Sequence, residues 1–260
     1  MTQISAQGAL LALASGALVG ALLALFGGGG SVLATPLLLY VVGVRDPHVA
    51  IGTSAAAVSF NAGLNLIGHW RGGRMKWGCA SVFAGSGLAG SILGSTLAKH
   101  VDGRRLLLLF ALAMAAVAIL MLRRLSGEGD PHVRLGWPVA LRIVPMGLAI
   151  GFAAGFFGIG GGFLIVPGLM AATGMPLAHA VASSLLSVSI FGAATAANYA
   201  LSGLLDWRIA GLFIAGGFGG GLVGLRGAAV LATRAILARR LFASLVLAGA
   251  AYVGWRAVSG

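Results

Sequence analysis

Apolar residues run along most of the chain in long blocks, and charged residues, glycine or proline separate one block from the next. Blocks of about 20 apolar residues are long enough to cross a bilayer as helices. The pattern predicts an all-α, polytopic integral membrane protein with about eight transmembrane helices and two short half-helices or re-entrant segments. The expected segments are 7–26, 30–43, 47–68, 78–98 and 105–122, followed by 138–157, 161–173, 177–200, 208–225 and 241–258.

The second segment of each half is too short to cross the membrane alone. About 13 residues reach roughly 20 Å as a helix, whereas the hydrocarbon core is about 30 Å thick. Unpaired backbone is not tolerated against lipid, so the turn before each short segment is expected inside protein or beside a watery cavity. Pro36 and Pro167 lie within these segments, and Gly43 and Gly174 are expected to end them. Asp46 is expected to cap the segment that follows the first of them.

One glycine-rich block precedes both short segments, and its two copies are 131 residues apart. Nine of 23 positions are identical between residues 26–48 and 157–179. We therefore expect two homologous repeats: 1–124 with a broken helix at 26–36, and 138–260 with a broken helix at 157–167, joined by a polar linker at 125–137.

The relative direction of the two repeats depends on the number of crossings in each. Four full crossings per repeat would make the copies parallel, and three or five would make them inverted. Lys and Arg follow the third and the fourth segment of both halves. This distribution weakly favours cytoplasmic loops after both fourth segments.

Composition supports a membrane protein. Only 8% of the 260 residues are charged, against about a quarter in soluble domains, and the mean hydropathy is +1.01. The net charge is +12, and the basic residues responsible for it lie between the apolar blocks. We therefore expect contact with the lipid bilayer and not with nucleic acid. The single cysteine, Cys79, excludes an intrachain disulfide and offers no metal cluster. The start of the chain lacks a basic signal-peptide region, and the first helix is expected to be retained.

The glycine blocks are the strongest candidate for a binding site. Backbone N–H groups at a helix start carry partial positive charge and attract anions, and glycine lets a ligand approach the backbone. Close helix packing would use the same glycines, so this alternative stays open. If the two turns converge near the bilayer midplane, the expected substrate contacts are Gly27, Gly28, Gly29, Gly30, Ser31, Gly158, Gly160, Gly161 and Gly162.

Small polar residues on the third segment of each half could complete this site. Neutral donors suit an anion that must bind and then leave, but such residues also join membrane helices. Two histidines, His48 and His179, occupy matching positions and are candidates for a proton or anion relay or for interfacial hydrogen bonding. The other histidines, His69, His100 and His132, are expected in solvated loops. The expected polar contacts are Thr53, Ser54, Asn61, Asn65, Ser183, Ser184 and Ser187.

The expected spans contain no acidic residue. Transport of metal cations, or of protons on a buried carboxylate, needs such residues in the membrane, so an anionic or neutral substrate is favoured. Neither a His-Glu-x-x-His motif nor a Walker A motif occurs. We expect no enzyme activity, no metal, no cofactor and no use of ATP by this chain.

Taken in order, these motifs resemble a known family. The block Phe-Gly-x-Gly-Gly-(Gly/Ser)-x-Leu-x-x-Pro in both halves, the Ala-x-Gly-Thr-Ser of residues 50–54, and the Gly-x-x-x-Trp endings at 73–77 and 203–207 resemble the sulfite exporter TauE/SafE family over about 230 residues. Ile159 replaces Gly28 in the second copy, so the two half-sites are not expected to bind equally. The resemblance implies anion transport across the bacterial cytoplasmic (inner) membrane.

The resulting hypothesis is a secondary transporter that exports a small organic or inorganic sulfur anion, such as sulfite, sulfoacetate or another organosulfonate. It would work by alternating access, with the anion held at paired half-helix N-termini. A passive anion channel and a non-transporting membrane scaffold are the alternatives. Glycine-rich helix faces are also compatible with a homodimer.

Overall fold

The computed structural model describes residues 6–123, 129–130, 133, 135–158, 162–231 and 235–259, which form helices and no strand, as the sequence predicts. The N-terminal half contains α1 (Ala6–Phe26), the 3₁₀ segment η1 (Gly27–Leu33), α2 (Ala34–Leu37), the π-helical segment η2 (Leu38–Val42), α3 (Pro47–Arg71), α4 (Trp77–Ala98) and α5 (Gly103–Arg123). The C-terminal half contains α6 (Trp137–Phe157), α7 (Gly162–Thr173), α8 (Leu177–Leu201), α9 (Trp207–Leu231) and α10 (Ala235–Ser259).

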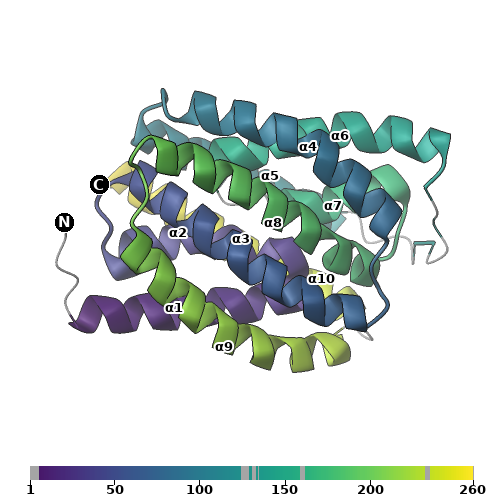
Figure 1. Cartoon of the computed structure of the whole chain (residues 1–260), viewed down its shortest axis with the longest axis horizontal. Helices are drawn as coiled ribbons and strands as arrows, with labels where there is room; N and C mark the ends of the chain where they lie inside the picture. Colours follow the sequence, from purple (N-terminus) through teal and green to yellow (C-terminus); the bar gives the residue numbers. More distant parts are fainter. Residues whose placement is uncertain are drawn as a thin grey trace.

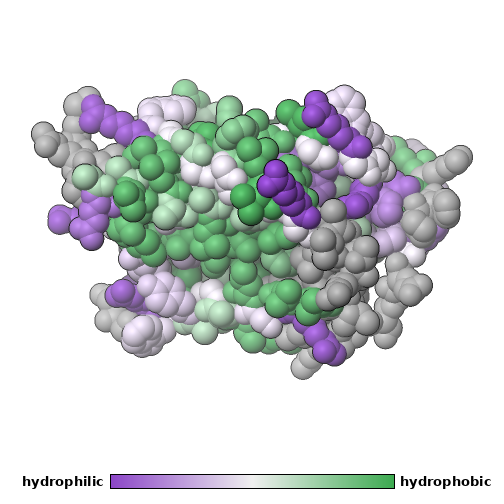
Figure 2. Space-filling model, turned by 90° about the horizontal axis from the view of Figure 1, so that it is seen from below, coloured by the Kyte–Doolittle hydropathy of each residue, from purple (hydrophilic) through white to green (hydrophobic). Residues whose placement is uncertain are grey.

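Six helical stretches of the described residues are long and apolar enough to cross a membrane: Ala6–Val42, α3, α4, α6, α8 and α9 up to Ala228. The helices α5 and α10, of 21 and 25 residues, fall outside this set, and α7 is a shorter apolar helix. All five tryptophans are exposed and lie near helix ends, as in the aromatic belts at the membrane surface. Figure 2 shows hydrophilic residues gathered towards the two ends of the bundle, with an apolar belt between them. The architecture is that of a multi-pass membrane protein.

The breaks and ends of the short segments follow the glycine signals of the sequence. Gly27 and Gly158, at the two breaks, have φ of +60° and +65°, and Gly43 and Gly174 end the short segments with φ of +86° and +75°. A side chain is strained in this left-handed region, whereas glycine is not. The predicted cap at α3 is also confirmed, because the Asp46 carboxylate accepts the N–H of His48 at 2.8 Å.

Two glycine-rich seams join the halves. α1 packs along α9, and α4 packs along α6. A Cβ on Gly16 or Gly20 would collide with the backbone of α9, and a Cβ on Gly90 or Gly94 would collide with the backbone of α6. Because these helices approach at backbone distance, each seam holds a helix of one half against a helix of the other.

α3 and α8 cross at the centre of the bundle and run antiparallel (Figure 1). Near the start of α3, a Cβ on Gly52 would meet Leu204, which follows the end of α8. Beyond the end of α3, the N–H of Lys76 donates to Ser183 near the start of α8 at 3.0 Å. α3 and α8 are the third segments of their halves, so corresponding helices run in opposite directions.

This arrangement corrects the expectation that the loops after both fourth segments share one side. The fourth segments are α4 and α9, and they end at opposite ends of the bundle (Figure 1). We call the end that carries the start of α1 and the end of α10 the termini end, and the end where α5 stops and α6 begins the linker end. Counting Lys and Arg by segment could not distinguish the two ends of the bundle, because the loops after α4 and α9 lie at opposite ends.

Candidate functional site

The two glycine turns meet in the middle of the bundle. A Cβ on Gly28 would lie 2.6 Å from the Cα of Gly162 and 2.5 Å from a methyl group of Val188, which is close to the midpoint of α8. Gly28 and Gly162 are both buried. The backbones of the two turns therefore touch without any side chain between them, and the predicted convergence of the turns is present.

A hydroxyl of a central helix lies beside each turn. The N–H of Gly28 donates to Ser184 Oγ of α8 at 3.0 Å. On the other side, Ser54 Oγ of α3 lies 3.5 Å from the carbonyl oxygen of Gly158 and 2.8 Å from Thr35 Oγ1. α8 thus binds the first glycine turn, whereas the Ser54 hydroxyl of α3 donates to the carbonyl oxygen of Ile51 at 3.0 Å and only approaches the second turn. Ser54 and Ser184 are two of the hydroxyls that the sequence proposes as substrate contacts, and both lie beside the turns.

The remaining members of the first block also face protein. Ser31 Oγ donates to the carbonyl oxygen of Gly28 at 2.8 Å, within the 3₁₀ segment. A Cβ on Gly30 would overlap the backbone of Leu22 and Leu23, so Gly30 lets the turn fold back on α1. Gly29 is buried as well. The predicted contacts Gly160 and Gly161 lie outside the described residues.

Thr53 and Ser183 serve a different purpose from the one expected. Thr53 Oγ1 accepts the N–H of Asp206 at 3.0 Å, and Ser183 Oγ accepts the N–H of Lys76 at 3.0 Å. Thr53 therefore anchors the connection between α8 and α9, and Ser183 anchors the connection between α3 and α4. In the structure these two hydroxyls bind loops and not the glycine turns.

The predicted pair Asn61 and Asn65 lies at the seam of α1 and α9. Asn65 Nδ2 donates to the carbonyl oxygen of Asn61 at 3.0 Å and lies 3.5 Å from that of Gly20. The Asn61 amide is fully buried against Gly217, and neither its oxygen nor its nitrogen has a hydrogen-bond partner. The hydroxyl of Ser187 is likewise buried without a partner. Buried polar groups of this kind are costly unless they are paired, so these two side chains could accept a ligand or a water molecule.

The histidines differ from one another in their surroundings. His48 and His179 are half-buried near the starts of α3 and α8, and each has an unpartnered Nδ1. The ring of His48 stacks on Tyr199 with centroids 6.4 Å apart. The expectation of a solvated His69 is wrong: this residue is only 6% exposed, and its Nε2 lies 2.9 Å from the carbonyl oxygen of Ala24. His100 is exposed as expected, and His132 lies outside the described residues.

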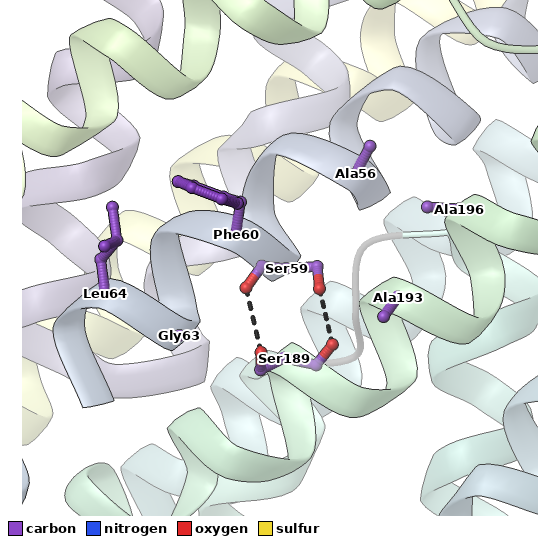
Figure 3. A pocket seen from close by; sticks show the side chains of 8 residues that line it. All are labelled: Ala56, Ser59, Phe60, Gly63, Leu64, Ser189, Ala193 and Ala196. Atoms are coloured by element: carbon purple, nitrogen blue, oxygen red, sulfur yellow. Dashed lines mark hydrogen bonds between the residues drawn. The ribbon is translucent and has the colours of Figure 1, made fainter. Parts of the chain in front are cut away.

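Two features beside the turns lie outside the list of expected substrate contacts. Thr35 joins Ser54, and its only sequence signal is its place directly before Pro36 in the short segment. The other is a reciprocal pair at the crossing of α3 and α8, drawn in Figure 3, in which Ser59 Oγ donates to the carbonyl oxygen of Ser189 at 2.6 Å and Ser189 Oγ donates to that of Ser59 at 3.1 Å. A hollow of about 420 Å³, lined mainly by small apolar residues, lies beside the pair.

Comparisons with known proteins also indicate a membrane transporter. A family model described as sulfite exporter TauE/SafE matches residues 12–253. A "Probable membrane transporter protein" of Xylella fastidiosa is 50% identical over 251 residues, which cover 96% of each chain. The "Probable membrane transporter protein YdhB" of Bacillus subtilis is 27% identical over 225 residues, or 86% of this chain and 90% of that relative. No solved structure matches the chain. These names are names of transporters and not of enzymes.

Proposed function

The chain belongs to the sulfite exporter TauE/SafE family, and we propose that it is a secondary transporter that exports a small sulfur-containing anion across the bacterial cytoplasmic membrane. Sulfite, sulfoacetate and other organosulfonates are the proposed substrate class. The observation that carries the proposal is the contact between Gly28 and Gly162, where two buried glycine turns meet at backbone distance.

The electrostatics of the turns favour an anion. Helix starts present unpaired N–H groups with partial positive charge, and both turns lie in stretches without Asp, Glu, Lys or Arg, at residues 1–44 and 143–205. An anion held by neutral dipoles is not trapped by a fixed cation and can leave again. Ser184 Oγ accepts the N–H of Gly28, and its own hydroxyl donates to the carbonyl oxygen of Val181 at 2.8 Å. A bound anion would therefore take the place of Ser184 Oγ as the acceptor of the Gly28 N–H.

Alternating access gives the contact between the turns a role. We treat the halves as two inverted repeats, in which the α1–α9 and α4–α6 seams move as rigid units about α3 and α8. Gly27 lies against Val181, the fifth residue of α8, and Gly158 lies against Ile51, the fifth residue of α3. The first turn is thus reached from the linker end and the second from the termini end, and a ligand can enter only when the turns separate.

Purified protein reconstituted into liposomes tests the proposal. Uptake of sulfite, sulfate, thiosulfate and organosulfonates is measured with and without the same anion trapped inside. Saturable uptake that the trapped anion accelerates supports a transporter. Flux without saturation or counter-flow would instead identify a passive channel. If the protein neither binds nor transports any of these anions, the proposed substrate class is overturned.

A further inference from the structure

Basic residues are distributed unequally between the two ends of the bundle. Six of them belong to the termini end by their place in the fold: Arg45, Lys99, Arg104, Arg105, Arg208 and Arg256. Eight described residues belong in the same way to the linker end: Arg71, Arg74, Lys76, Arg123, Arg142, Arg226, Arg239 and Arg240. Three more arginines of the sequence, at positions 124, 134 and 234, lie outside the described residues. The linker end is therefore the more basic one.

The acidic residues at the termini end have local roles. Asp46, Asp102 and Asp206 each accept backbone N–H groups at the starts of α3, α5 and α9. Lys99 at this end is also engaged, because its ammonium group donates to Asn198 Oδ1 at 2.7 Å and to Ser202 Oγ at 2.9 Å. The membrane orientation of helical proteins follows Lys and Arg in short loops and depends little on Asp and Glu.

From this asymmetry we infer that the linker end faces the cytoplasm, where its basic residues contact anionic lipid headgroups, and that the termini end faces the other side of the membrane. This orientation does not depend on the transported solute. The cytoplasmic leaflet is rich in anionic lipids and attracts basic segments at the membrane surface. In combination with the proposed function, the first glycine turn is the one that an anion from the cytoplasm reaches first.

Two exposed leucines at opposite ends allow a matched test. Leu135 precedes α6 at the linker end, and Leu201 ends α8 at the termini end, with exposures of 43% and 90%. The full-length variants Leu135→Cys and Leu201→Cys are made in a Cys79→Ser background, which removes the only native thiol. A membrane-impermeant maleimide is then added to intact cells and to permeabilised cells.

We expect Leu201→Cys to react in intact cells, and Leu135→Cys to react only after permeabilisation. The opposite pattern, or labelling of both variants in intact cells, overturns the inference. Alkaline phosphatase fused after residue 260 gives an independent readout that needs no substitution: the enzyme is active if the termini end is periplasmic, and inactivity of a stably expressed fusion overturns the inference. Absence of anion flux in liposomes would count against the proposed function and leave this orientation unaffected.

Discussion

The substitution Gly28→Ala tests the contact between the glycine turns. The new Cβ would lie 2.6 Å from the Cα of Gly162 and 3.0 Å from its carbonyl oxygen, whereas real Cβ atoms essentially never come closer than 3.0 Å to such a neighbour and ordinary contacts begin at 3.4 Å. The Cα of Gly162 belongs to the backbone and cannot rotate away, so the turns have to move apart.

Overpacking of this kind costs about 1–3 kcal/mol. In a chain of this size the cost lowers the denaturation temperature by about 2–4 °C per kcal/mol, which can be measured on purified protein in detergent. If the closed turns are one state of the transport cycle, the same cost lowers the ratio of that state to the open states about 5- to 150-fold. Anion flux into liposomes, normalised to folded protein, should fall accordingly.

Gly219→Ala is the matched control. Gly219 lies in α9, and a Cβ there meets nothing within 4 Å. Alanine is favoured over glycine in a helix by up to about 1 kcal/mol, so this variant should be as stable as the original or slightly more stable, with unchanged flux. If Gly28→Ala matched this control in both stability and flux, the turns would not be in functional contact and the reasoning would be refuted.

Three further predictions concern hydrogen bonds, and each is measured as a change in the free energy of unfolding in detergent. Ser184→Ala leaves a buried N–H of the first glycine turn unpaired and should cost about 1–3 kcal/mol; no change would mean that another acceptor reaches it. Ser59→Ala and Ser189→Ala should each cost about 0.5–1.5 kcal/mol and should add, because each hydroxyl binds a backbone carbonyl that the other substitution leaves in place. Lys99→Met and Asn198→Leu should together cost less than their sum, because they remove one shared interaction; strict additivity would contradict the contact.

The helices were predictable because their signals are local. The lengths of the apolar blocks and the positions of Gly and Pro place most helix ends within a few residues of those observed. The exceptions have one cause. α9 continues past Arg226 to Leu231, and α10 begins at Ala235 before Arg239 and Arg240, because a helix can extend into the polar interface where the apolar block has already ended.

The candidate site was only partly predictable, because hydrogen-bond partners depend on tertiary contacts. The sequence identified Ser54 and Thr53 as neighbouring hydroxyls of one helix, but not that Ser54 reaches a glycine turn while Thr53 anchors the loop at Asp206. His69 shows the same limit. The charged residues next to it in the sequence predict a solvated loop, yet α3 extends past His69 and brings its imidazole against α1.

The exchange of helices between the halves has a consequence for biosynthesis. α1 packs against α9, so Gly20 can contact Gly217 only after Gly217 has been synthesised, about 200 residues later. At about 5–20 residues per second this interval lasts roughly 10–40 s. During that time the nascent first half has its glycine faces exposed to lipid or to the insertion machinery. The final fold can therefore close only after α9 has left the ribosome.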